Sequence, residues 1–489
     1  MKTKPGKKRS GILRRDAHTR AAPSPSGGGK ASFCQSTKSF CCILLSIFFL
    51  TILLPSSSPA ATLYVSESVP GEYRLIQDAL DAAAAGDEVV VRDGKYNEAN
   101  LDCRGKAITL RSENGPDYTI INGSGDRAIG FFNGEGPGTV VSGFKIKTYV
   151  SPSRGYVTGI VCYYSSPTIS NCTIGGEGGL FPHSGGGFAL IHSSPIITEC
   201  EIRWNGANAG GGINAQDSSP TITHCKIHGN WAYWGGGIFL DAGCRPTISN
   251  CAIYRNHSDG AGGGIFCDNS SPIIINCTIA KNRANASPPA GAALHCSEDS
   301  SPNVCNSILW GNNDPGLPEV FGREVLITYS DIEGGYAGEG NIDQDPLFVA
   351  PVLGNFELSD GSPAIDAGTL IVDPPLPATD LAGTPRIING KVDMGAYEYL
   401  SAPAAGPGPI EDLVSCVDAL ALPRALANSY LAHLKKVEAF IAAGQLTPAI
   451  HQLEAFIGKL RSDIEKGNIS SVCGEPILEM AEALIEMLQ

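Results

Sequence analysis

Aromatic residues that could bind a sugar gather in one part of the chain. All four tryptophans and two tyrosines follow similar short phrases: Trp204, Trp231, Tyr233, Trp234, Tyr254 and Trp310. Trp and Tyr bury a large area and keep a polar edge, so an exposed row of them would stack on sugar rings. We expect the six to lie on one side of the folded chain, with hydrogen-bond partners at Arg203, His228, Asn230, Arg255 and His257. The alternative is a hydrophobic cover over the turns.

Acidic residues recur at fixed places, which does not suit a unique active site. They lie just before Ser-Pro turns: Asp217, Asp241, Asp268, Glu298 and Asp299. This recurrence indicates that the acidic side chains hydrogen-bond to the backbone of the turns. The alternative is that they bind Ca²⁺. The histidines are scattered and paired with no motif: His183, His192, His224, His228 and His257. No CxxC or His/Cys cluster indicates a metal site. The sequence therefore identifies no catalytic residue, and we predict no cofactor, with Ca²⁺ only if the chain is a lyase.

The same part of the chain contains an internal repeat. A phrase of the type SSPTISNCTI recurs, and its prolines are spaced by 28, 25, 26, 26 and 30 residues. Five residues after each of the first five prolines comes a cysteine: Cys172, Cys200, Cys225, Cys251 and Cys277. Ten residues after the later prolines comes an asparagine: Asn205, Asn230, Asn256, Asn282 and Asn312. A Gly-rich turn into an apolar residue then follows, as in GGGI.

Each repeat is a set of short β-branched runs separated by turns. Such strands cannot bury a face alone, so neighbouring copies must stack as coils of a parallel β-helix, with strands about 4.8 Å apart. Equivalent residues then form ladders along the axis. Stacked cysteines point the same way, so we expect buried, mostly reduced thiols that act as small hydrophobes rather than disulfides. Asparagine suits the turns because it tolerates a left-handed backbone.

The chain before the repeat continues the pattern loosely over 62–150. The segment YRLIQDALDAAAAGD, ending at Asp87, has a helical apolar period and stands between the strand-like runs TLYV and EVVVRDG. We predict a short helix that covers the open end of the first coil and protects the sheet edge. The solenoid is expected over residues 62–350.

These segments resemble a known superfamily. IQDALDAAAAGDEVVVRDGKYNE resembles the opening of the pectin-lyase-like right-handed parallel β-helix proteins, and SSPTI-NC-I resembles their repeats. Further on, GNIDQDPLF, GSPAIDAG, DLAGTPRI and KVDMGAYEY resemble the choice-of-anchor Q domain, which implies a closing segment over 351–400. The superfamily contains lyases, hydrolases, epimerases and adhesins, so the resemblance implies a fold and no particular chemistry.

The composition changes after a Pro/Gly/Ala linker at 401–410. Helical spacing then predicts an α-helical domain over 411–489, with helices at Glu411–Leu420, Ala425–Ala443, Pro448–Lys466 and Pro476–Leu488. The segment LKKVEAFIAAGQLTPAIHQLEAFIGKLRSDIEKG resembles the FIMAH module of exported bacterial proteins. Whether Cys416 and Cys473 form a disulfide is left open, and a protein partner for this domain is one expectation.

The charge distribution indicates export and excludes nucleic acid. The chain has 489 residues and a net charge of −14, of which residues 1–40 contribute +9, leaving −23 for the rest. Such an acidic body does not suit a phosphate backbone. Residues 1–61 combine a basic stretch, the apolar run Cys41–Leu54 and small residues, which predicts a secretory signal or, alternatively, a retained membrane anchor. A polytopic membrane protein, a coiled coil and wholesale disorder are excluded by composition.

Together these features predict an exported all-β right-handed parallel β-helix with a helical cap and a small α-helical C-terminal domain. The expected function is non-catalytic: polysaccharide binding, adhesion or structure at the cell surface or outside the cell. The alternatives are a polysaccharide lyase or glycoside hydrolase acting on an acidic glycan, and a pure spacer.

Overall fold

The computed structural model describes residues 60–400, except 124–125, 148–149, 152–154, 157, 176–185, 286–289, 298 and 313–317, and most of 410–488. Ser58–Gln489 make up a unit of their own. The expected signal segment, His183, Glu298, the linker at 401–409, Cys416 and Cys473 lie outside the described residues. Among the described helices, none is both long and apolar enough to cross a membrane.

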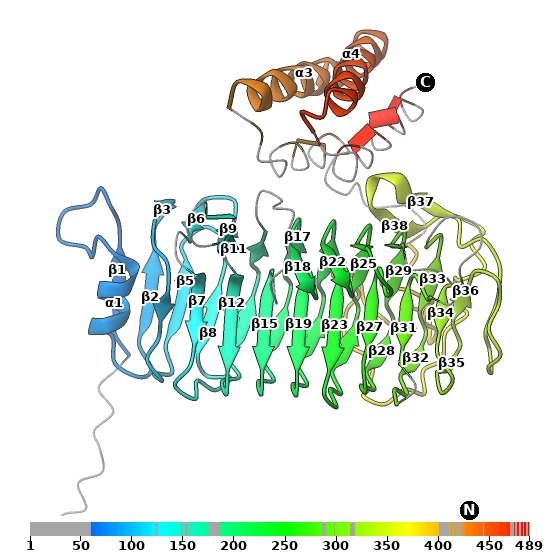
Figure 1. Cartoon of the computed structure of the whole chain (residues 1–489), viewed down its shortest axis with the longest axis horizontal. Helices are drawn as coiled ribbons and strands as arrows, with labels where there is room; N and C mark the ends of the chain where they lie inside the picture. The colour runs from blue at the N-terminus through cyan, green and yellow to red at the C-terminus, as the bar shows by residue number, and fades with distance from the viewer. Residues whose placement is uncertain are drawn as a thin grey trace, which may run out of the picture. The chain divides into compact units, whose positions relative to one another are not determined.

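The chain winds into a parallel solenoid built from three long sheets and one small sheet (Figure 1). Each coil passes from sheet A to sheet B and then to sheet C, and in four of the described coils the small sheet lies between sheets B and C. Sheet A consists of β1 (Thr62–Val65), β2 (Glu88–Val91), β5 (Thr109–Ser112), β8 (Val140–Ser142), β13 (Thr168–Ser170), β16 (Ile196–Thr198), β20 (Thr221–Thr223), β24 (Thr247–Ser249), β28 (Ile273–Ile275), β32 (Asn303–Cys305) and β35 (Leu326–Thr328).

Sheets B and C complete the long walls. Sheet B consists of β3 (Gly94–Tyr96), β6 (Thr119–Asn122), β9 (Lys145–Lys147), β14 (Thr173–Ile174), β17 (Glu201–Arg203), β21 (Lys226–His228), β25 (Ala252–Tyr254), β29 (Thr278–Ala280), β33 (Ile308–Trp310) and β36 (Asp331–Ile332). Sheet C consists of β4 (Leu101–Asp102), β7 (Arg127–Phe131), β12 (Thr158–Tyr163), β15 (Phe188–Ile191), β19 (Ile213–Gln216), β23 (Ile238–Asp241), β27 (Ile265–Cys267), β31 (Leu294–Cys296) and β34 (Val320–Phe321).

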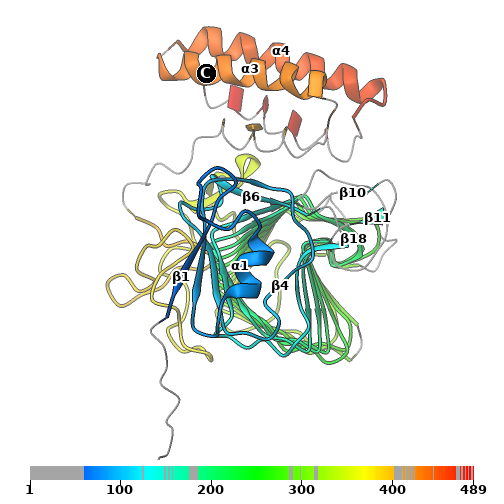
Figure 2. The same cartoon turned by 90° about the vertical axis from the view of Figure 1, so that its left-hand side faces the viewer.

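The small sheet lies at the corner between sheets B and C. It consists of β18 (Gly206–Ala209), β22 (Trp231–Trp234), β26 (His257–Ser258) and β30 (Arg283–Ala284). A hairpin of β10 (Val150–Ser151) and β11 (Gly155–Tyr156) precedes β12. The predicted cap is the helix α1 (Ile76–Ala82), which buries Ile76, Ala79 and Leu80 against the first coil (Figure 2). The predicted fold class is therefore confirmed.

The interior is made of the expected ladders. Equivalent isoleucines of sheet A pair in register and are fully buried: Ile169, Ile197, Ile222, Ile248 and Ile274. The five predicted cysteines are buried free thiols within the same core. The Cys225 thiol, for example, donates to the Thr223 carbonyl at 3.2 Å. Burial raises the pKa of the Cys172 thiol well above its usual value, which suits a hydrophobic filler.

The predicted asparagines form a continuous hydrogen-bonded column. The backbone N–H and the side-chain amide of Asn230 both donate to the Asn256 Oδ1 of the next coil, at 3.0 and 2.9 Å. The side-chain amide also donates to the Ile202 carbonyl of the preceding coil at 2.9 Å. The last member, Asn312, needs another acceptor, and the buried carboxylate of Glu319 supplies it at 2.9 and 2.6 Å.

A second polar column has its carboxylate at the opposite end of the repeat. It consists of buried residues of the Ser-Pro turns, and the backbone N–H of each of the first five donates to the side chain of the next: Ser165, Ser193, Ser218, Cys244, Ser270 and Ser300. Where this column begins, the Ser165 hydroxyl donates to Glu135 at 2.9 Å. Burial alone would raise the pKa of Glu135, but two backbone N–H groups and Ser165 lower it below its usual value.

The segment 351–400 packs against the solenoid with little regular structure of its own. It follows β37 (Phe348–Ala350) and contains η1 (Pro351–Leu353) and β38 (Asn355–Leu358). Asparagines at the corner between sheets A and B hold it: Asn276 donates to the Asp393 carbonyl at 3.0 Å, and Asn250 accepts from Arg386 at 2.8 Å. Arg386 is fully buried and also pairs with Glu398 at 2.9 Å. Whether the segment is a choice-of-anchor domain stays a prediction.

The C-terminal region is helical. Its described helices are α3 (Arg424–Ala442) and α4 (Leu446–Glu465), which agree with two of the four predicted helices to within about two residues. Tyr430, Leu434, Leu453, Phe456 and Leu460 form their shared core. The Tyr430 hydroxyl donates to Asp463, which also accepts from Lys459. The other two predicted helices fall largely on residues outside the described set.

We expect Arg386→Met to lower the free energy of unfolding by about 3 kcal/mol or more, because Glu398, Asn250 and the Ala396 carbonyl would lose their buried hydrogen-bond donor. Lys391→Met is the matched control, since the Lys391–Asp366 pair is about half exposed and worth at most about 1 kcal/mol. Urea denaturation of both variants measures the difference. Equal losses would contradict the role assigned to the buried pair.

We expect Glu319 to make the solenoid less stable as the pH rises. Burial raises its pKa from 4.5 to about 8, against the two hydrogen bonds from Asn312, so folding takes up a proton between these values. The free energy of unfolding then falls with pH over this window, by up to about 1.4 kcal/mol per unit. Denaturation of the wild type and Glu319→Gln at pH 5, 6.5 and 8 tests this. Parallel pH profiles would contradict it.

Candidate functional site

The six predicted aromatic residues do not form a single row. Tyr254 pairs in register with His228, and Trp310 lies two coils further along the same outer row of sheet B. Trp204 occupies the turn after β17, with φ of 54°, and its indole lies over Gly229 of the next coil. The other three belong to β22. The expectation that all six share one side is therefore wrong, because the chain turns a corner between sheet B and the small sheet.

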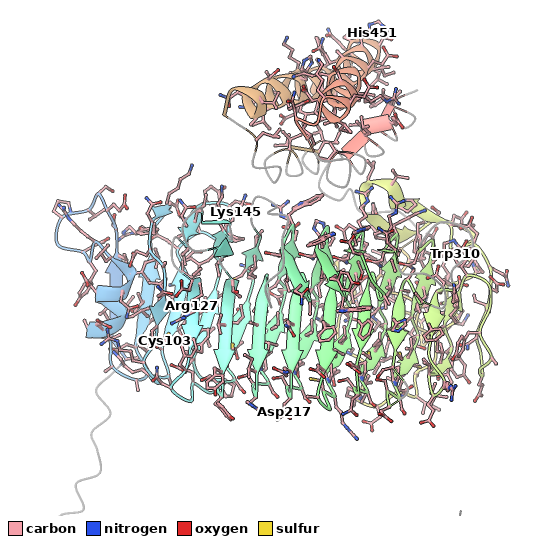
Figure 3. The ribbon with its side chains drawn as sticks, in the orientation of Figure 1. Cys103, Arg127, Lys145, Asp217, Trp310 and His451 are labelled. Carbon is pink, nitrogen blue, oxygen red and sulfur yellow. The ribbon has the colours of Figure 1, made fainter. Side chains whose placement is uncertain are left out.

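The sheet-B aromatics serve largely as packing surface. Tyr254 is only 8% exposed and stacks on His228 at 4.6 Å and against Phe356 at 5.0 Å. Trp310, labelled in Figure 3, is half-buried beside Leu358 and Met394. Both therefore take the alternative role, as apolar cover beneath segment 351–400.

Two of the expected polar partners on sheet B, Arg203 and His228, both pair with Glu201, which was not among them. The Glu201 carboxylate lies 3.0 Å from His228 Nε2 and 3.3 Å from Arg203 Nε. Burial would raise the pKa of Glu201, but His228 and the positive charges of Arg203 and Lys226 lower it to about 2. Burial lowers the pKa of His228 below 6.5, against the effect of Glu201. Arg255, also predicted, lies in the next turn with φ of 52° and is half-buried.

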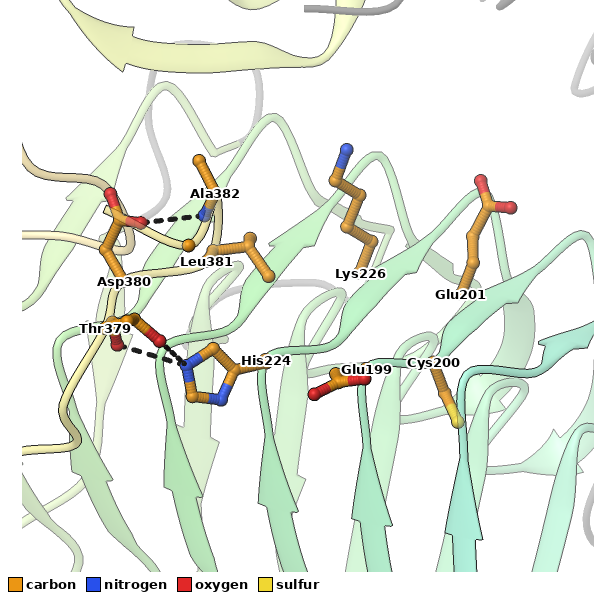
Figure 4. A pocket seen from close by; sticks show the side chains of 10 residues that line it. Glu199, Cys200, Glu201, His224, Lys226, Thr379, Asp380, Leu381 and Ala382 are labelled. Atoms are coloured by element: carbon orange, nitrogen blue, oxygen red, sulfur yellow. Dashed lines mark hydrogen bonds between the residues drawn. The ribbon is translucent and has the colours of Figure 1, made fainter. Parts of the chain in front are cut away.

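A cleft of about 380 Å³ lies beside this charged group (Figure 4). Its floor is formed by Glu199, His224 and Lys226, and its wall by the loop 379–383. His224 Nε2 lies 3.0 Å from the Thr379 carbonyl, and the buried Asp380 accepts the Ala382 and Thr384 N–H groups at 2.9 and 2.7 Å. Much of the cleft's polar surface is thus used to hold segment 351–400 in place.

The strand β22 presents the most exposed aromatic side chains of the predicted set. Tyr233 is 47% exposed and Trp234 is 36% exposed, and their rings meet edge to face at 4.8 Å. Trp234 packs against Gly260, where even a Cβ atom would lie 2.6 Å from the indole. Trp231 is half-buried and pairs in register with His257. Within β22, Trp231 is therefore the least exposed of the three aromatic side chains.

Trp234 leads to an aromatic row on the outer face of sheet C that sequence reasoning missed. Its ring lies 5.4 Å from Phe266. Phe266 stacks on Phe239 at 5.4 Å and on His295 at 4.7 Å, and His295 stacks on Phe321 at 4.9 Å. We call these four residues the sheet-C aromatic row. The signal was present, because in GGGIF, GGGIF, GAALH and PEVF an aromatic ring directly follows the inward apolar residue.

The histidine of this row behaves as an aromatic spacer. His295 Nδ1 accepts the Gly291 N–H at 3.3 Å. Burial lowers the pKa of His295 to about 4, although the charge of Asp268 acts to raise it. The sheet-C aromatic row therefore carries no positive charge at neutral pH.

Another of the scattered histidines, His192, is also paired with a carboxylate. His192 Nδ1 lies 2.7 Å from Asp217, and its ring stacks on Tyr164 at 4.5 Å. Both members are solvent-accessible and lie at the turns between sheets C and A, where Figure 3 labels Asp217. The sequence showed no motif around His192 because its partner lies 25 positions away and becomes a neighbour only when coils stack. Within the described part of the chain, no three His, Cys, Asp or Glu side chains form a group that could hold a metal ion.

These features define the class of protein: a parallel β-solenoid with an exposed aromatic corner, followed by a helical domain. Residues 158–331 match the family described as right handed beta helix region, and residues 410–486 match the FIMAH domain. The chain thus contains a right-handed β-helix region and a C-terminal FIMAH domain, as the resemblances implied.

Solved structures with a similar fold include the pectate lyase Pel9A, at 14% identity and a TM-score of 0.46, covering 70% of this chain and 97% of that one. Another is the pectin methylesterase from Aspergillus niger, at 15% identity and a TM-score of 0.36, covering 51% of this chain and 84% of that one. Likenesses at this level carry no information on activity. No curated protein sequence is significantly similar to the chain.

We expect His295 to titrate near pH 4 in the folded protein, because its stacked ring is shielded from water on both faces. Asp268→Asn is expected to lower this pKa further, since the aspartate charge stabilises the imidazolium. NMR titration of the histidine ring signals, assigned with His295→Gln, measures both values. A midpoint near 6.5 would show that the ring is not buried within the row.

Proposed function

We propose that the protein binds a polysaccharide, without cleaving it, at the corner formed by Tyr233, Trp234 and the sheet-C aromatic row. The observation that carries this proposal is the exposure of Tyr233 and Trp234 beside a continuous row of rings. Large exposed aromatic surfaces on a folded chain mark interaction sites more often than they serve packing. Trp and Tyr also supply ring faces for sugar C–H groups and polar edges for hydroxyls.

We assign different roles to the sheet-C aromatic row and to the side chains of Tyr233 and Trp234. Phe239, Phe266, His295 and Phe321 stack on one another, so much of each ring face is already covered by its neighbour. Stacking of this kind stabilises the coils by about 0.5–1.5 kcal/mol per pair. Trp234 is tilted by 58° relative to Phe266. We therefore assign the direct sugar contact to Trp234 and Tyr233, and the support beneath them to the row.

The proposed function also requires that the protein is exported. The basic and apolar segment at 1–61 would direct the chain to the cell surface or the outside, where polysaccharides are found. The FIMAH domain would then be available for a protein partner. The alternative is that the protein cleaves a glycan as a lyase or hydrolase. The same experiment tests this alternative, because cleavage would release products.

The test compares Trp234→Ala with Trp231→Ala in the Ser58–Gln489 chain by affinity electrophoresis in gels that contain soluble polysaccharides. We expect Trp234→Ala to weaken binding at least tenfold, about 1.4 kcal/mol, and Trp231→Ala to change it by less than twofold. The two variants lose the same side chain from the same strand, so a general loss of stability would affect both.

Three outcomes would contradict the proposal. Equal weakening by both variants would place the contact elsewhere or show a folding defect, and circular dichroism distinguishes these. An absence of retardation in every gel would remove polysaccharide binding. New reducing ends or unsaturated products, followed in the same incubations with and without Ca²⁺, would establish the enzymatic alternative.

A further inference from the structure

Acidic and amide side chains run alongside the sheet-C aromatic row. In the register of sheet C, the outward position two residues after Phe239 is Asp241, which pairs with Gln216 of the preceding coil. One coil further, Asp268 follows Cys267, the partner of Leu240, and donates its backbone N–H to the Leu240 carbonyl at 2.8 Å. Asp241 and Asp268 are therefore stacked neighbours beside Phe239 and Phe266.

The charge of this face is negative where the rings are densest. Gln216 Nε2 donates to Asp241 at 3.3 Å, and Asp268 is exposed and close enough to act on the pKa of His295. Arg323 stands at the last coil beside Phe321 and is itself engaged in an interaction within the chain.

Several cations of the repeat lie on sheet B or in the turn after it, Arg245 lies in the turn after β23, and Arg283 of the small sheet is engaged in an interaction within the chain. Arg203 and Lys226 belong to strands of sheet B, and Arg203 pairs with Glu201. Lys281 lies in the turn after sheet B, with its side chain against Gly311. Because the chain outside residues 1–40 carries a net charge of −23, no general attraction of polyanions offsets the local acids.

We infer that the polysaccharide taken by this face is neutral, and that Asp241 and Asp268 both bind its hydroxyl groups and exclude polyuronates. The inference rests on the proposed function and narrows its substrate class. Carboxylates accept strong hydrogen bonds from sugar hydroxyls, whereas a uronate carboxylate placed beside them would be repelled. Like-charge placement of this kind is a common source of specificity.

The test uses the Ser58–Gln489 chain in gels containing neutral polymers (hydroxyethylcellulose, galactomannan) or acidic polymers (polygalacturonate, alginate) at low salt. Low salt is chosen because salt weakens the repulsion between charges at the surface. At 0.1 M salt this repulsion is largely screened beyond about 10 Å. The variants are Asp241→Asn with Asp268→Asn, and a control pair with the same change of charge, Asp117→Asn with Asp360→Asn, at exposed sites away from sheet C. Trp234→Ala is included in every gel.

We expect the wild type to be retarded by a neutral polymer and not by the acidic ones. The Asp241/Asp268 variant should bind the neutral polymer several-fold more weakly and gain retardation by polygalacturonate, while the control pair behaves as the wild type. Wild-type retardation by an acidic polymer that is lost in Trp234→Ala would overturn this inference but leave the proposed function intact. An absence of retardation by either class would overturn both.

Discussion

Each coil of the solenoid is joined to the next by parallel backbone hydrogen bonds in register, and the rest of the structure depends on this stacking. Equivalent residues are forced into columns about 4.8 Å apart, so an inward residue must be compatible with its own copies. Apolar columns satisfy this by packing. Polar columns satisfy it only if every donor finds an acceptor one coil away, as Asn230 and Asn256 do. At one end of each polar column the hydrogen-bond donors have no further copy to bind. There the buried carboxyl groups of Glu135 and Glu319 accept their hydrogen bonds.

The same constraint orders the outer surface. An aromatic residue that recurs at one outward position becomes a stacked row without any further specification, as Phe239, Phe266 and His295 show. The outer face of a strand is then used in one of two ways. On sheet B, segment 351–400 covers Tyr254 and the alanines beside it. On sheet C and the small sheet, Tyr233 and Trp234 keep a substantial exposed area.

This division explains why a shared fold does not indicate a shared activity. The interior columns hold the coils together whatever the protein does, and they dominate any comparison with other right-handed β-helices. Activity resides in the outward rows, which vary independently of the interior. Here those rows combine exposed rings with Asp241 and Asp268 on one side, and place Glu201, Arg203 and Lys226 on another, so the two sides differ in charge and in aromatic exposure.

The sequence by itself determined the coil, its period and its interior. Side chains alternate along strands and coils repeat about every 26 residues, so Ile222, Cys225 and Asn230 could be placed without coordinates. The aromatic residues could not. Trp231 and Trp234 are only three residues apart but differ in exposure, and Tyr254 is covered by Phe356, about a hundred residues later. Exposure is decided by where the chain turns its corner and by what packs there from a distant segment, and only the tertiary structure contains that information.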